Sequence, residues 1–164
     1  METLTPEKKE VRYAGFWLRF VAYIIDDLIL GFVSFIVSLP FIGGIVFSAL
    51  GMSECSEFND STFLGIAGIV GSVFALILVN IAAGWLYYSL MESSKTQATL
   101  GKMALSLKVT DLEGNKISFG RATGRYFGKI ISGMILMIGY ILAGITEKKQ
   151  ALHDMMAGCL VIRD

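Results

Sequence analysis

Residues 15–30, GFWLRFVAYIIDDLIL, decide the fold because they place one arginine and two aspartates inside an apolar run. Trp17 is typical of the membrane interface, and the apolar side chains follow directly behind it. A charged side chain at the centre of a membrane helix costs about 2.5–3.5 kcal/mol on insertion scales, so Arg19, Asp26 and Asp27 need a compensating role. The stretch predicts a membrane helix that carries charged residues near one end.

Helix geometry relates the three charges to one another. At about 100° per residue, Arg19 and Asp26 lie on nearly the same face with Tyr23 between them, whereas Asp27 points about 80° away from Arg19. We therefore expect Arg19 to interact with Asp26. Two interpretations stay open: Asp26 is a proton or cation site, or Arg19, Tyr23 and Asp26 form a structural cluster that joins helices.

Composition places the chain among integral membrane proteins. Its 164 residues are 54% hydrophobic with a mean hydropathy of +0.65, which is too apolar for an ordinary soluble protein, and they predict a single domain over 1–164. The net charge of zero gives no support to a nucleic-acid partner. The expected partner is the lipid bilayer.

Two uncharged runs, 28–53 and 61–91, each exceed the roughly 20 residues that cross the hydrocarbon. They predict transmembrane helices over 17–48 and 63–91, with Pro40 kinking or ending the first. Glycines in the second helix indicate close packing against another helix. They are Gly65, Gly68 and Gly71. Asn80, the single amide in that run, is expected to bond across helices more readily than to bind a ligand.

Lys and Arg predict the orientation. Four lie in 1–19, seven in 92–129 and three in 147–164, whereas the connector has none. The positive-inside rule then makes the N-terminal segment 1–16 cytoplasmic, the loop 51–62 external and the segment 92–129 cytoplasmic. The first helix is interpreted as an uncleaved signal anchor. Cys55 and Cys159 are then on opposite sides and should not form an intramolecular disulfide.

The third apolar run, 130–146, has only 17 residues and carries three glycines. A single crossing would leave the Lys-rich tail, 147–164, outside the cell. A re-entrant or interfacial segment would keep the tail in the cytoplasm, and this is the interpretation favoured here.

The segment 92–129 contains an alternating pattern. Residues 103–110 predict a strand, Gly114 a turn and residues 117–119 the start of a return strand, which together form a small cytoplasmic β-hairpin. The terminal residues 159–162 predict a strand that could pair with 103–110. Glycines at every fourth position from 120 to 128 are each followed by a basic residue. This pattern suits a helix that lies on anionic lipid headgroups, or an ordinary positively charged flank of a membrane helix.

Motifs of enzymes are missing from the sequence. The Gly-Lys pair at 101–102 lacks the Walker A spacing, and no zinc-protease or serine-hydrolase motif occurs. His153 and Asp154 are adjacent, so one helix face cannot easily present both to a metal. We expect no enzyme activity, no cofactor and no metal site.

The ordered motifs resemble the RDD family of small bacterial membrane proteins. Arg19 and Asp26 in RFVAYIID match the first-helix arginine and aspartate, and QALHDMMAGCLVI resembles the C-terminal signature with His153 and Asp154. The central stretch QATLGKMALSLKVTDLEGNKIS and the arginine that follows it resemble the middle of the family pattern. The matching residues there are Thr99, Gly101, Lys102 and Arg125. Asp27 is an additional carboxylate that the family pattern does not require.

The resemblance implies an all-α protein of the bacterial cell (inner) membrane, with two long helices, a third short segment and the small hairpin. It also implies one function, since some members have been linked to exchange of Na⁺ or related cations for protons. In that hypothesis Asp26 carries the proton, Asp27 and Asn80 help to bind the cation, and a homo-oligomer encloses the path. The alternative is a membrane-embedded adaptor or regulatory protein whose hairpin and tail bind a partner protein, for example by strand addition.

Overall fold

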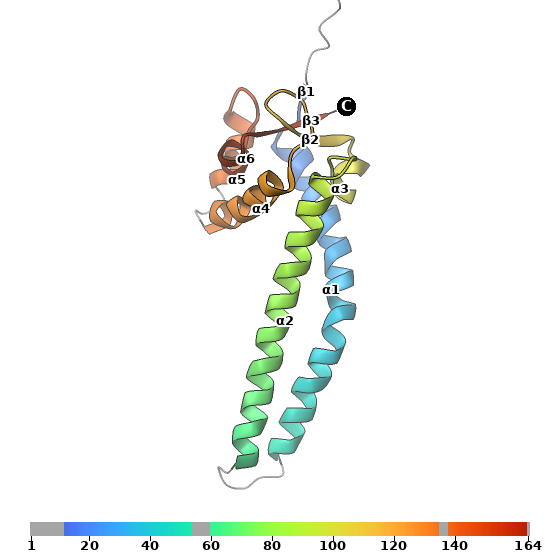
Figure 1. Ribbon diagram of the computed structural model, residues 1–164, viewed down its shortest axis with the longest axis vertical. Coiled ribbons are helices and arrows are strands. Elements are labelled where there is room, and N and C mark those ends of the chain that lie inside the picture. Colours follow the sequence, from blue (N-terminus) through green and yellow to red (C-terminus); the bar gives the residue numbers. More distant parts are fainter. Residues whose placement is uncertain (1–11, 54–59, 135–137, 164) are drawn as a thin grey trace, which may run out of the picture. The chain divides into compact units, whose positions relative to one another are not determined.

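The computed structural model describes residues 12–53, 60–134 and 138–163. Two long helices, α1 (Phe16–Ser53) and α2 (Asp60–Glu92), account for much of the chain, as Figure 1 shows. Both are long and apolar enough to cross a membrane. The predicted helices over 17–48 and 63–91 are confirmed, and α1 continues through Pro40 instead of ending there. Of the predicted segment 1–16 and the predicted loop 51–62, residues 1–11 and 54–59 lie outside the described residues.

The chain divides into two compact units, and the division falls within α1 and α2. We call residues 27–53 and 60–87 the helix-pair unit, and residues 12–26, 88–134 and 138–163 the sheet unit. In the helix-pair unit large apolar side chains face outward, for example Phe47, which is 81% exposed. A bilayer is the environment that would cover them.

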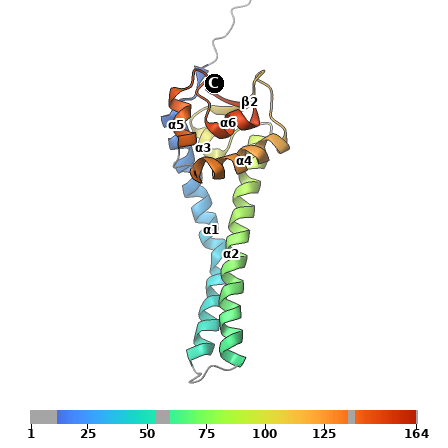
Figure 2. The same cartoon turned by 90° about the vertical axis from the view of Figure 1, so that its left-hand side faces the viewer.

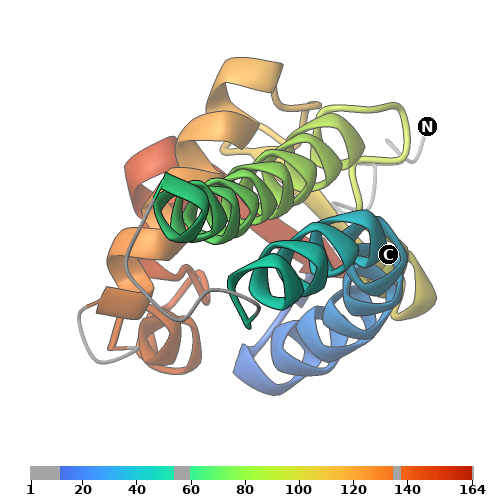
Figure 3. The same cartoon turned by 90° about the horizontal axis from the view of Figure 1, so that it is seen from below.

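Small residues allow the two helices of the helix-pair unit to approach closely (Figure 3). A Cβ atom at Gly44 would lie 3.2 Å from Oγ of Ser72, and one at Gly68 would lie 2.5 Å from Oγ of Ser48. The predicted close packing through glycine is therefore confirmed at Gly68. At Gly71 an added Cβ would meet no described atom within 4 Å, so this glycine is not required for the close contact.

A three-stranded antiparallel sheet organises the sheet unit. Its strands are β1 (Arg12–Tyr13), β2 (Leu107–Asp111) and β3 (Cys159–Arg163), in the order β1–β3–β2. The predicted pairing of the terminal strand with the strand from residues 103–110 is confirmed, since Val109 of β2 lies opposite Val161 of β3. The strand β1 was not predicted, because two residues are too few to show an alternating pattern.

The predicted hairpin is largely replaced by this sheet. Residues 103 and 104 end the short helix α3 (Leu100–Ala104), and the segment after the turn forms only one isolated bridge, Thr110 to Lys116. The return strand does not develop because the helix α4 (Phe119–Met134) begins at once. Ser118 favours that start, since its Oγ accepts a hydrogen bond from the backbone N–H of Arg121 at 3.3 Å.

The third apolar run, 130–146, contains the last residues of one helix and all of a second helix that is bent away from it. The helix α4 is followed by α5 (Ile138–Ile145), and their axes differ by 99°. Eight residues of α5 span about 12 Å, much less than the roughly 30 Å of hydrocarbon. This shape suits the predicted re-entrant or interfacial segment. The short helix α6 (Leu152–Ala157) then packs against α4 and leads into β3 (Figure 2).

The core of the sheet unit lies between one face of the sheet and the helices. It consists of small and branched aliphatic side chains, with Leu107, Val109 and Val161 from the strands and Ala22 and Ala122 from α1 and α4. Alternate residues of β2 supply Leu107 and Val109, as expected for a strand with one face on a core. This packing brings the first turns of α1, the end of α2, and α3, α4 and α6 together around the site described next.

Candidate functional site

An ion-pair cluster of six residues lies among these elements. Its members are Arg19 of α1, Glu92 of α2, Lys102 of α3, Arg125 and Lys129 of α4, and Asp154 of α6. All six belong to the sheet unit. Five distant segments of the chain therefore contribute charge to one place.

Arg125 links the two carboxylates of the cluster. Its Nε donates to Oδ1 of Asp154 at 2.6 Å, and its Nη1 donates to Oε2 of Glu92 at 2.8 Å. The side chain is only 2% exposed, and Glu92 and Asp154 are buried as completely. Such charges are tolerated inside a protein only when they are paired and hydrogen-bonded, and Arg125 satisfies both carboxylates.

Arg19 attaches α1 to the C-terminal segment. Its Nη1 donates to Oδ2 of Asp154, its Nη2 donates to the Lys149 carbonyl oxygen at 2.6 Å, and its Nε donates to the Ala14 carbonyl oxygen at 2.9 Å. The predicted pairing of Arg19 with Asp26 is therefore wrong. The arginine turns toward a carboxylate 135 positions away in the chain, which helix periodicity cannot reveal.

Glu92 gathers the remaining cations. Lys102 donates from Nζ to Oε1 at 2.5 Å, and Nζ of Lys129 lies 3.5 Å from the same oxygen. Lys129 also lies over the ring of Tyr88, 4.1 Å from its centroid. In the sequence Glu92 stands out only as the end of an uncharged run, and Lys129 only as part of a basic flank. The spacing of four between Arg125 and Lys129 was the available signal that both face one side of α4.

Asp26 makes a separate junction between α1 and the start of α3. Its Oδ2 accepts the hydroxyl proton of Thr99 at 2.5 Å, and its Oδ1 accepts the backbone N–H of Gly101 at 2.7 Å. The carboxylate is 1% exposed. Three residues of the family resemblance, Thr99, Gly101 and Asp26, are thus brought together. The helix dipole also stabilises a carboxylate at the first turn of a helix.

The other two predicted ion-site residues do not join these groups. Asp27 is exposed in the helix-pair unit. Asn80 donates from Nδ2 to the Leu76 carbonyl oxygen at 2.9 Å, within its own helix. The expected bond from Asn80 across helices is therefore wrong, because the preceding turn offers a nearer acceptor.

Burial and neighbouring charges set the protonation of the groups outside the spans. Burial raises the pKa of Asp154, but Arg125 and Arg19 outweigh it and hold that pKa well below its usual range. Burial and the nearby Arg125 lower the pKa of Lys102 to about 7, although Glu92 acts in the opposite direction. The two arginines therefore hold Asp154 in the charged form.

His153 is a buried structural residue beside the cluster. Its ring lies 5.1 Å from the Tyr140 ring centroid, and its Nδ1 lies 3.5 Å from Oγ of Ser132. Burial lowers the pKa of His153 to about 3. Within the described ranges, no three His, Cys, Asp or Glu side chains are grouped as metal ligands.

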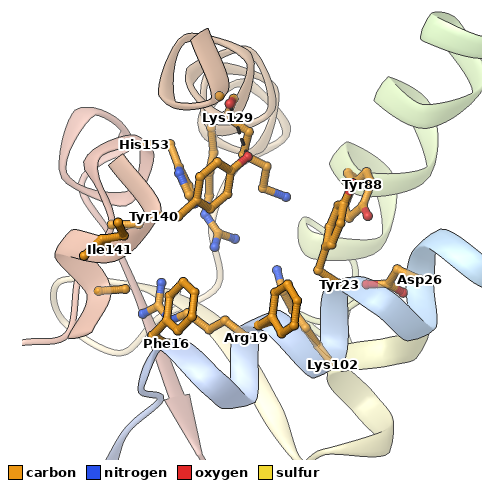
Figure 4. Close-up of a pocket in the computed structure, with 15 residues that line it drawn as sticks. Phe16, Arg19, Tyr23, Asp26, Tyr88, Lys102, Lys129, Tyr140, Ile141 and His153 are labelled. Carbon is orange, nitrogen blue, oxygen red and sulfur yellow. Dashed lines mark hydrogen bonds between the residues drawn. The ribbon is translucent and has the colours of Figure 1, made fainter. Parts of the chain in front are cut away.

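A cavity of about 480 Å³ opens beside the ion-pair cluster (Figure 4). Its wall combines cationic and aromatic side chains from α1, α4 and α5 with contributions from α2, α3 and α6. The lining residues are Phe16, Arg19, Phe20, Tyr23, Asp26, Tyr88, Lys102, Arg125, Lys129, Gly133, Tyr140, Ile141, Ala143, Ala151 and His153. A small molecule fits such a volume, since binding pockets usually measure about 300–1,000 Å³.

Comparison with known proteins places the same residues in a family. The model of the RDD family matches residues 13–158, a range that includes Arg19, Asp26 and Asp154. The chain is 38% identical over 149 residues to the uncharacterized protein YxaI of Bacillus subtilis (strain 168), covering 91% of this chain and 96% of that protein. It is 31% identical over 159 residues to the uncharacterized membrane protein YteJ of the same strain, covering 93% and 82%. No solved structure matches. The chain is an integral membrane protein that belongs to the RDD family.

Proposed function

We propose that this protein is a membrane-anchored adaptor or regulator, in which the sheet unit is the part that other components contact. The observation that carries the proposal is the engagement of Asp26. Both of its oxygens accept hydrogen bonds from donors fixed by the start of α3. A carboxylate that alternates between a proton and a cation must be accessible to both, whereas both oxygens of Asp26 are already hydrogen-bonded and the residue is buried.

The strand pairing in the sheet supports a particular path of the chain through the membrane. The strand β3 pairs with β1, which precedes α1, and with β2, which follows α2. Three segments that share a sheet lie on one side of a bilayer, so we propose two crossings, with residues 130–146 entering and returning. The distribution of Lys and Arg favours the cytoplasm for that side.

The hydrogen bonds at the outer edge of β2 favour recognition of a partner protein through side chains over recognition by strand addition. The Val109 N–H donates to the Gln97 carbonyl oxygen at 2.7 Å, and Nε2 of Gln97 donates to the Val109 carbonyl oxygen at 3.3 Å. The Asp111 N–H is likewise bonded to the Asn115 carbonyl oxygen. An incoming strand would have to displace these bonds.

Ion flux in proteoliposomes tests the proposal. The purified full chain, reconstituted with a pH-sensitive dye inside the vesicles, is exposed to Na⁺ and K⁺ gradients. The expected result is the same proton movement as in protein-free vesicles. Cation-dependent proton flux that disappears in Asp26→Asn but persists in Asp27→Asn would instead establish the exchange hypothesis, which would further require a homo-oligomer to enclose the path.

A further inference from the structure

The cavity beside the ion-pair cluster has two chemically different walls. Figure 4 shows the ammonium groups of Lys102 and Lys129 directed toward the same central space, from α3 and α4. Phe16 and Ile141 lie at the opposite side of that space. Phe20, whose ring stacks on that of Phe16, also lines the cavity. Such a site suits a ligand with an anionic end and an apolar end.

The carboxylates of the cluster stand behind the cations and not in the cavity wall. Glu92 and Asp154 are at most 1% exposed and do not line the cavity, whereas their partners Lys102, Arg125 and Lys129 do. Asp26 is the one carboxylate in the wall, and Thr99 and Gly101 already donate to it. The surface that a ligand meets is therefore mainly cationic.

The charges of the site are also unequal. Four cationic side chains line the cavity, Arg19 among them. Only three carboxylates lie in or behind its wall: Glu92, Asp154 and Asp26. Glu92 alone is shared by Lys102, Arg125 and Lys129. An anion in the cavity would balance the excess, and it would favour the charged form of Lys102, whose pKa burial lowers.

The cavity is lined in part by residues at the ends of the two long apolar helices. Phe16 and Phe20 lie in the first turns of one apolar helix, and Tyr88 lies in the last turns of the other. Trp17, 73% exposed in the same first turn, is a residue that prefers the membrane interface. Both apolar helices exceed the roughly 20 residues that cross the hydrocarbon, so their ends extend beyond it toward the lipid headgroups.

We propose that this cavity binds an anionic membrane lipid, with its phosphate against Lys129 and Lys102 and its acyl chains leaving over Phe16, Phe20 and Ile141. Basic pockets beside membrane helices are suited to anionic headgroups, because charge-assisted hydrogen bonds to phosphate are strong. The apolar wall distinguishes this ligand from a free phosphate ion. The inference goes beyond the adaptor proposal and does not depend on it.

Titration of the detergent-solubilised full chain with short-chain lipids tests the proposal. Native mass spectrometry measures the binding of dioctanoyl phosphatidylglycerol, dioctanoyl phosphatidylcholine and inorganic phosphate. We expect phosphatidylglycerol to bind at least about tenfold more tightly than phosphatidylcholine, the difference that one charge-assisted contact gives. Equal binding of the two lipids would overturn the proposal, as would inorganic phosphate binding as tightly as the lipid.

Two variants with matched controls locate the site. Lys129→Gln removes one cation, while Lys102 and Arg125 still hold Glu92, and Lys116→Gln removes an exposed lysine outside the cavity. Gly133→Leu fills the cavity at a position where an added Cβ meets no described atom within 4 Å, and Gly124→Leu adds the same bulk elsewhere on α4. We expect about tenfold weaker phosphatidylglycerol binding in both cavity variants and wild-type binding in both controls. Unchanged binding in either folded cavity variant, or equal loss in its control, would overturn the assignment.

Discussion

Asp26 and Asp27 are neighbours in the chain that meet different surroundings. Asp26 is buried and accepts hydrogen bonds from Thr99 and Gly101, whereas Asp27 is exposed. A helix turns by about 100° per residue, so two adjacent side chains cannot both point at the same junction. The pair therefore offers its own internal control.

Asp26→Asn is expected to lower the free energy of unfolding by about 1–3 kcal/mol, and Asp27→Asn to change it by less than about 0.5 kcal/mol. An amide has one acceptor oxygen, so its NH₂ group must face either the Thr99 hydroxyl or the Gly101 N–H. Thermal unfolding in detergent measures both variants. Equal losses in the two would mean that the hydrogen bonds of Asp26 do not stabilise the fold.

Arg125 is expected to be the most costly residue of the ion-pair cluster to replace. Arg125→Met leaves Glu92 and Asp154 buried with one strong partner fewer each, at a cost of about 3–5 kcal/mol. Arg121→Met on the same helix changes an exposed side chain and serves as the control. Chemical denaturation followed by circular dichroism distinguishes them, and similar midpoints would contradict the role of Arg125.

His153 gives the folded chain a defined pH dependence. Its pKa is lowered to about 3 by burial, with Arg125, Lys129 and Arg19 adding to that effect and Asp154 opposing it. Between pH 6.5 and 3 the unfolded chain binds a proton at this residue and the folded chain does not, so stability falls as the pH falls. The loss from this residue reaches about 2 kcal/mol at pH 5.

The variant His153→Gln isolates this contribution. Because glutamine does not titrate, the melting temperature of the variant should fall less between pH 6.5 and pH 5 than that of the natural chain. The slope is compared and not the absolute stability, since the contact with Tyr140 also changes. Parallel slopes would show that His153 binds a proton equally in both states.

At the scale of elements, the junction of α1 with α3 depends on a glycine. A Cβ atom at Gly101 would overlap the Ala22 carbonyl oxygen and lie 3.0 Å from Cγ of Asp26. The backbone of α3 must approach this closely for the Gly101 N–H to reach the carboxylate. Close approach, and not an unusual φ, is what requires glycine here.

Gly101→Ala is therefore expected to destabilise the chain by about 1–3 kcal/mol, because α3 must move away from α1. Gly124→Ala in α4 meets no described atom within 4 Å and should raise stability by about 0.5–1 kcal/mol, the usual helix preference of alanine. Parallel thermal melts compare them. Stabilisation by both substitutions would argue against the tight junction.

At the scale of the whole molecule, the sheet restricts the paths that the chain can take through a bilayer. The central strand β3 comes from the tail, and its two neighbours flank the long helices in sequence. A tail on the far side of the membrane could not form these hydrogen bonds. The bent pair α4 and α5 is compatible with the entry and return that we propose.

We expect Cys55, in the connector between the long helices, to react in intact cells with a membrane-impermeant thiol reagent. Cys159 is buried in β3 and should remain unlabelled. Reporters fused to the N-terminus and the C-terminus should both be active in the cytoplasm only. Labelling of Cys55 only after permeabilisation, or reporters active on opposite sides, would contradict the proposed arrangement.

The sequence by itself determined the two long helices and the pairing of the terminal strand. Each of these depends on properties local to a segment, such as uncharged length or alternation along a strand. The partner of Arg19, the inclusion of Glu92 in the cluster and the cavity were decided only by the tertiary structure. Helix periodicity predicts only which residues share a face of one helix. A buried charge pairs with the opposite charge that the packing of distant elements brings near, which for Arg19 and Arg125 is Asp154.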